Sequence, residues 1–413
     1  MSILYSFKNT VFIWVLMFIS CGNQAKLSKN LEVSQFPEPE ITTNKPIIVA
    51  ANRTDAYLPL LKGKKIGIVA NQTSVVFKKE GGYTHLVDSL LSLQVDIKKV
   101  FAPEHGFRGK ADAGEAVKDD VDTKTGLPLL SLHGKNRKPP AALLKDLDII
   151  VFDIQDVGVR FYTYIATLQL VMEACAENNI PILVLDRPNP NGHYVDGPGM
   201  EAEHTSFLGM TQIPLVYGMT IGEYAKMLNG EEWLEDKNKA DLTVIPLENY
   251  THNSAYHLPI RPSPNLPNDK SINLYPSLGL FEGTNINAGR GTEFQFQRYG
   301  ASFLDSTYYK FSYTPQPNFG SKYPKEEGKL SFGNDISDAA KMSEVSLKWV
   351  IDAYTNCPKK DLFFLTNGFT KHAGTKKLQQ QIEAGLSESE IKKTWQQDLM
   401  DFKKIREKYL SYP

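Results

Sequence analysis

The segment at 101–114, FAPEHGFRGKADAG, places ionisable side chains directly after an apolar run. The run DIKKVFA at 96–102 is typical of a buried strand, and it ends just before Glu104 and His105. In an open α/β sheet, the ligand crevice lies at the carboxyl ends of the strands. Glu104 is therefore the first candidate for a catalytic group, and His105 is a candidate ligand contact.

Other strand ends carry polar clusters as well. Apolar runs rich in β-branched residues alternate with helical patterns, which predicts a mostly parallel, doubly wound α/β sheet of the Rossmann-like kind. We expect the polar residues that follow these strands to converge on one crevice. The predicted strands are 64–70, 97–102, 147–154 and 181–186, and the polar candidates at their ends are Asn71, Asp153, Asp156 and Arg187.

The sequence lacks the phosphate-binding patterns that often accompany such a sheet. Neither GxGxxG nor GxxxxGK[ST] follows a predicted strand, so we expect no nucleotide cofactor. GxSxG is also absent, which argues against an α/β-hydrolase serine enzyme. With a formal net charge of -1 and no basic tract, the composition argues against a nucleic-acid partner.

Metal and disulfide signals are weak. His105 and His133 stand apart from any ligand spacing and there is no CxxC pair, so the sequence predicts no metal site. After Cys21 only Cys175 and Cys357 remain. A disulfide framework is not expected, although a single bridge is left open.

The 413 residues are enough for two packed lobes, which we place at 46–205 and 206–413. The second is expected to be a smaller α+β lobe, with the active site in the cleft between the two. Its stretch at 261–302 is dense in Pro, Gly and Asn and predicts a long functional loop system. The tail at 376–410 has the pattern of amphipathic helices.

The N-terminus carries an export signal. Lys8 precedes an apolar run at 11–20, which is too short for a membrane span but suits a signal peptide at 1–20. The residues before Cys21 resemble a bacterial lipobox, which implies lipidation of Cys21, with 21–45 as a flexible tether. The alternative is a plain signal peptide cut nearby. We therefore expect an exported lipoprotein, periplasmic or at the cell surface, anchored to a bacterial membrane.

Several long motifs follow one another along the chain: APEHGFRG (102–109), FDIQDVGVRFYTYIATL (152–168), LDRPNPNG (185–192), YGMTIGE (217–223), RPSPNLP (261–267) and FEGTNINAGRGTEFQFQRYGA (281–301). Together they resemble the NamZ-type exo-β-N-acetylmuramidases over about residues 46–413. This family resemblance implies a glycoside hydrolase that removes N-acetylmuramic acid from the non-reducing ends of peptidoglycan fragments.

Glycosidic cleavage needs an acid for the departing oxygen and a second group for the oxocarbenium-like centre. Glu104 is the candidate acid; the structural alternatives are a helix cap or a pair with Arg108. The second group is Asp153, Asp156 or Glu282, unless the substrate uses its own acetamido carbonyl. Asp153 could instead cap the turn before Tyr162.

Muramic acid carries a lactyl carboxylate, so a selective pocket should present a cation. Arg290 is favoured because the flanking glycines allow the backbone to approach a ligand closely, although it could instead pair with Glu282. Aromatic rings would form the apolar side of the sugar site, with core packing as the alternative. The other candidates are Arg160, Arg187 and Arg261 for the carboxylate, and Tyr162, Tyr164, Tyr275 and Phe281 for the sugar face.

Two other functions stay open at this stage. A non-catalytic wall- or sugar-binding lipoprotein could use the same cleft. A metal-assisted hydrolase could share the scaffold.

Overall fold

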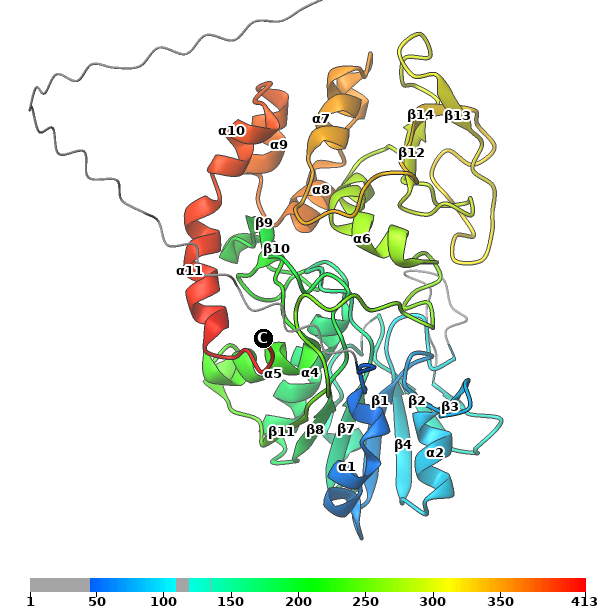
Figure 1. Cartoon of the computed structure of the whole chain (residues 1–413), viewed down its shortest axis with the longest axis vertical. Helices are drawn as coiled ribbons and strands as arrows, with labels where there is room; N and C mark the ends of the chain where they lie inside the picture. Colours follow the sequence, from blue (N-terminus) through cyan, green and yellow to red (C-terminus); the bar gives the residue numbers. More distant parts are fainter. Residues whose placement is uncertain (1–44, 109–118, 135) are drawn as a thin grey trace, which may run out of the picture. The chain divides into compact units, whose positions relative to one another are not determined.

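A seven-stranded sheet forms the centre of the fold (Figure 1). Its order is β11 (Leu242–Ile245), β8 (Ile182–Leu185), β7 (Ile149–Asp153), β1 (Ile66–Ala70), β4 (Ile97–Ala102), β6 (Pro128–Ser131) and β5 (Asp120–Val121). All neighbours are parallel except β5 and β6. Numbered along the chain, the six parallel strands have the Rossmann order 3-2-1-4-5-6. The predicted fold class is confirmed.

The computed structural model describes residues 45–108, 119–134 and 136–413, which belong to a unit spanning Thr43–Pro413. The signal peptide, the lipidation site at Cys21 and all of the tether except Lys45 lie outside the described residues. So does the Asp112-Ala113-Gly114 part of the opening segment. No helix among the described residues is long and apolar enough to cross a membrane.

Helices cover both faces of the sheet because the central strands are buried on both sides. In β7, Ile150 and Phe152 belong to one apolar cluster and Ile149 and Val151 to another, as alternation along a strand requires. The first cluster includes α4 (Tyr164–Glu177) and α5 (Ile221–Gly230), and the second includes α1 (Thr54–Leu61) and α2 (Leu86–Ser92).

The chain after the large sheet builds a smaller α+β region (Figure 1). A three-stranded antiparallel sheet has the order β12 (Arg298–Ala301), β14 (Ser331–Asp335) and β13 (Phe311–Tyr313). The helices of this part of the chain are α6 (Asp269–Leu278), α7 (Lys348–Thr355), α8 (Thr366–Ala373), α9 (Lys377–Glu383), α10 (Glu388–Lys393) and α11 (Gln396–Glu407). Among them, α11 contacts β9 and β10. The remaining elements are α3 (Ala141–Leu144) and the pairs β2 (Val75–Phe77) with β3 (Tyr83–His85) and β9 (Asp196–Gly199) with β10 (Pro214–Val216).

The prediction of a loop throughout 261–302 is wrong in part. The stretch contains α6, the 3-10 turn η4 (Gly279–Gly283) and β12. Asn268 starts the helix, since its side chain accepts a hydrogen bond from the Ser271 backbone N–H at 2.9 Å. Pro276 obscured this helix in the sequence, but it lies in the last turns. The predicted C-terminal helices are confirmed as α9 to α11.

Among the described residues, the two cysteines, Cys175 and Cys357, are buried free thiols.

Candidate active site

One pocket gathers side chains from the carboxyl end of the large sheet and from the smaller region. Glu104 and His105 reach it from the turn after β4, Tyr162 from the segment before α4, and Glu282 from η4. The other lining residues are Phe161, Thr163, Tyr164, Leu208, Ser263, Asn265, Leu266, Tyr275, Arg290, Phe296 and His372. The structure thus brings together seven of the fourteen residues predicted for catalysis and substrate binding, namely Glu104, His105, Tyr162, Tyr164, Tyr275, Glu282 and Arg290.

Glu104 is half-buried and lies in a tight turn that follows β4. The turn is set by His105, which has a left-handed φ of 70°, and by the hydrogen bond from Gly106 N–H to the Pro103 carbonyl at 3.0 Å. Thr163 Oγ1 donates to Glu104 Oε2 at 3.0 Å. The alternative partner, Arg108, bonds Asp122 Oδ2 at 2.8 Å. Glu104 therefore presents an oriented carboxyl group to the pocket.

Glu282 supplies a second carboxyl group, which lies beside positive charges. Burial alone would raise the pKa of Glu282, but the charges of Arg290 and Lys325 outweigh it and hold the pKa below its usual value. Arg290 Nε donates to Glu282 Oε1 at 3.1 Å. Glu282 thus makes the predicted ion pair and also lines the pocket as an ionised carboxylate.

Arg290 lies between Gly289 and Gly291, which have φ values of 78° and 76°. A Cβ on Gly289 would lie 2.4 Å from the Phe294 carbonyl oxygen, so this loop requires glycine there. The bond to Glu282 uses Nε and leaves Nη1 and Nη2 for other partners. A planar guanidinium with two such nitrogens can grip both oxygens of a carboxylate.

His372 also lines the pocket, but it was not predicted, because its segment carries no motif with catalytic spacing. His372 Nδ1 lies 2.9 Å from the Gly368 carbonyl, which can only accept, so Nδ1 carries the proton. Burial lowers the pKa of His372, although the Gly368 carbonyl and Glu282 oppose the shift. The ring is therefore neutral, and Nε2 is an acceptor on the pocket wall.

Arg160 holds this histidine in place instead of facing the ligand. Its guanidinium donates to four backbone carbonyls: Pro198 at 2.7 Å, Ile213 at 2.8 Å, His372 at 3.0 Å and Ala373 at 2.7 Å. The residue is buried, and burial lowers its pKa to about 9. Arg160 thus joins the segments around β9 and β10 to the end of α8.

Asp153 and Arg187 lie outside the pocket lining because they bind each other. Arg187 Nε and Nη2 contact the two Asp153 carboxylate oxygens at 2.6 and 2.7 Å, and both side chains are buried. Arg187 also donates to the Val75 carbonyl at 3.1 Å. This bidentate pair joins the carboxyl ends of β7 and β8.

Asp156, Asn71 and Arg261 also lie outside the pocket lining. Asp156 is buried, with Tyr217 Oη and the Gly158 N–H on Oδ2, and burial raises its pKa to about 6. Asn71 Oδ1 accepts from the Thr73 N–H at 2.8 Å, and Arg261 is exposed. Among the three carboxylates predicted as the second group, only Glu282 lines the pocket.

Aromatic rings form one wall of the pocket. Tyr162 contacts Tyr164 edge-on, with ring centroids 4.9 Å apart, and Tyr275 contacts Phe296 in the same way at 4.7 Å. Tyr162 Oη donates to the Pro262 carbonyl at 2.7 Å. These rings both pack in the core and line the pocket. Phe281, in contrast, is buried and stacks on Tyr299, with ring centroids 4.8 Å apart.

Glycoside hydrolases commonly use two carboxyl groups in different environments. This pocket holds such a pair beside an arginine and an aromatic wall. The chain belongs to the exo-beta-N-acetylmuramidase NamZ family: the N-terminal family model matches residues 66–270 and the C-terminal model residues 273–412. The resemblance predicted from the motifs is confirmed.

The chain is also similar to one named protein and to two solved structures. The peptidoglycan beta-N-acetylmuramidase NamZ of Bacillus subtilis strain 168 is 39% identical over 377 residues, which are 86% of this chain and 89% of that protein. Two crystal structures of DUF1343 family proteins from Bacteroides fragilis NCTC 9343 have the same fold, each covering 89% of this chain and 99% of the other. Their TM-scores are 0.82 and 0.76, at 45% and 27% identity.

Proposed function

We propose that this chain is an exo-acting β-N-acetylmuramidase that releases N-acetylmuramic acid from the non-reducing ends of peptidoglycan fragments. The observation that carries the proposal is that Glu104 and Glu282 line one pocket although they come from distant parts of the chain. Membership of the NamZ family and the named activity of the Bacillus subtilis relative support the substrate class.

The two glutamates take different roles. Glu104 protonates the glycosidic oxygen as the bond from C1 to that oxygen breaks. Glu282 stays ionised beside Arg290 and stabilises the positive charge that develops at C1, directly or through the substrate's acetamido group. A water molecule then attacks C1 and gives a proton to the Glu104 carboxylate, which restores the acid. His372 Nε2 accepts a hydrogen bond from a sugar hydroxyl, because its tautomer leaves that nitrogen without a proton.

The test is hydrolysis of a chromogenic aryl β-N-acetylmuramide by the purified protein. We expect release of the aryl group at room temperature, with and without a chelator. Binding of the sugar without any release would support the sugar-binding lipoprotein instead. Loss of turnover in the chelator, restored by a divalent ion, would support the metal-assisted hydrolase.

Arg290 is proposed to bind the lactyl carboxylate through Nη1 and Nη2. Arg290→Lys keeps the charge beside Glu282 but loses the forked geometry, so we expect kcat/KM for the muramide to fall about tenfold or more. The readout is the ratio of kcat/KM for the aryl muramide to that for the aryl glucosaminide, because damage to Glu282 would affect both substrates. Arg261→Lys, outside the pocket lining, is the matched control. An unchanged ratio in Arg290→Lys would remove Arg290 from this role.

The protein is further proposed to be an exported lipoprotein, periplasmic or at the cell surface, anchored to a bacterial membrane through Cys21. The apolar run at 11–20 followed by Cys21 supports this. Expressed in a bacterium, the full chain should fractionate with membranes and Cys21→Ala with the soluble fraction. Membrane association of both proteins would contradict lipidation at Cys21.

A further inference from the structure

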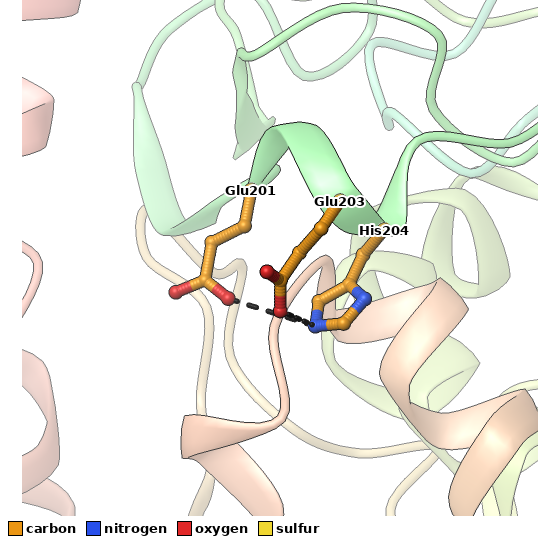
Figure 2. A group of neighbouring side chains, drawn as sticks. All are labelled: Glu201, Glu203 and His204. Carbon is orange, nitrogen blue, oxygen red and sulfur yellow. Dashed lines mark ion pairs between the residues drawn. The ribbon is translucent and has the colours of Figure 1, made fainter.

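Three donor atoms converge on one side of the turn η2 (Ala202–His204), at a distance in sequence from every catalytic candidate (Figure 2). His204 Nε2 lies 3.1 Å from Glu203 Oε1 and 3.7 Å from Glu201 Oε2. All three atoms lie within 4.8 Å of one another. Figure 2 shows both carboxylates turned toward the same imidazole nitrogen.

His204 gives an independent reason to expect a ligand. Its side chain is only 10% exposed, and among the described residues no hydrogen bond of acceptable geometry reaches Nε2. Glu201 Oε2 and Glu203 Oε1 lie within ion-pair distance of Nε2 but make no hydrogen bond to it, so a cation between the three atoms would satisfy this buried nitrogen better than the carboxylates alone. Lys377 Nζ takes the other oxygen of Glu201, Oε1, at 2.8 Å and leaves Oε2 directed at His204.

We propose that Glu201, Glu203 and His204 form a binding site for a divalent first-row cation, with Zn²⁺ as the best match. Imidazole nitrogen and carboxylate oxygen are both ligands of Zn²⁺, at roughly 2.0–2.2 Å. In a tetrahedron of that size, neighbouring ligand atoms lie about 3.4 Å apart. The two observed separations from Nε2, 3.1 and 3.7 Å, lie on either side of that value. Water would take the fourth position.

The position of the site points to a structural cation. None of the three residues lines the catalytic pocket. Glu201 N–H donates to the Gly374 carbonyl at 2.9 Å, and Gly374 directly follows α8, which carries His372. A cation held by the three side chains would therefore order η2 at the place where its backbone contacts the end of α8. Metal spacing in the sequence gave no sign of this site, since it uses one histidine and two neighbouring glutamates.

The experiment is calorimetric titration of the chelator-treated, dialysed protein with Zn²⁺, together with thermal unfolding with and without the ion. We expect one equivalent bound per chain and a rise in Tm. His204→Gln and Glu203→Gln each remove one ligand and should weaken binding by about 100-fold or more, beyond the 10–100-fold typical of an outer-shell partner. Glu203→Gln changes an exposed side chain and should fold as the wild type does. Thermal unfolding without Zn²⁺ checks that His204→Gln, whose side chain is 10% exposed, folds as well.

His257→Gln is the matched control, because His257 pairs with Asp269 in an exposed two-residue contact at 2.7 Å. It should bind Zn²⁺ as the wild type does. The proposal is overturned if the wild type binds no Zn²⁺ with micromolar affinity, or if His204→Gln binds it as tightly as the wild type. Either result is independent of muramidase activity.

Discussion

Glu104→Gln is expected to lower kcat on a natural muramyl disaccharide by about 10³-fold, within the range for loss of a general acid. That factor corresponds to about 4 kcal/mol of transition-state stabilisation. The amide has nearly the same shape as the carboxyl group, and its oxygen can still accept the hydrogen bond from Thr163 Oγ1. The variant should therefore keep the wild-type Tm. Its loss of turnover would then be chemical.

The role of Glu104 as an acid can be separated from other roles by changing the leaving group. A nitrophenolate leaves without protonation, whereas a sugar hydroxyl needs a proton in the transition state. Glu104→Gln should consequently lose much less of its bond-cleavage rate on a nitrophenyl muramide than on the disaccharide. Single-turnover release of nitrophenolate measures that step directly.

Glu293→Gln provides the control, because Glu293 is an exposed glutamate in the same loop as Arg290 and lies outside the pocket lining. It should behave as the wild type on both substrates. Equal losses on both leaving groups in Glu104→Gln would assign Glu104 to binding or positioning. Near-normal rates would exclude it from the reaction.

The strands could be predicted because buried strands are short runs of apolar, β-branched residues. The apolar runs at 64–70, 97–102, 147–154 and 181–186 match β1, β4, β7 and β8 to within a few residues, since central parallel strands are buried on both faces. The same logic placed Glu104 correctly at a strand end. Local pattern therefore sufficed for the sheet and for one wall of the site.

The other wall depends on contacts between distant residues, which no local pattern reveals. His372 enters the pocket because Arg160 binds its carbonyl across 212 positions of sequence. Asp153 and Asp156 look as catalytic as Glu282 in the sequence, because each is an acid beside a strand end or a glycine. Only the tertiary structure distinguishes an acid that lines a pocket from one enclosed by its partners.

Asp153→Asn is expected to destabilise the protein by about 3–5 kcal/mol, because it leaves the buried Arg187 charge without its bidentate partner. Arg187→Met should lower the free energy of unfolding by a similar amount, because it leaves the buried Asp153 carboxylate without its partner. The double variant Asp153→Leu/Arg187→Met removes both charges together and should lose less than either single variant. Chemical denaturation measures all three.

The exposed pair of Lys98 and Asp96 is the control, since their side chains are 41% and 51% exposed. Lys98→Met breaks this contact and should change the free energy of unfolding by under about 1 kcal/mol. The Asp153 variants also decide between a structural and a catalytic aspartate. If Asp153→Asn kept the wild-type stability and lost turnover, Asp153 would act in the chemistry. If it unfolds more easily while the folded fraction still cleaves the muramide, the pair with Arg187 is structural and joins the ends of β7 and β8. Glu282 then remains the second carboxylate of the reaction.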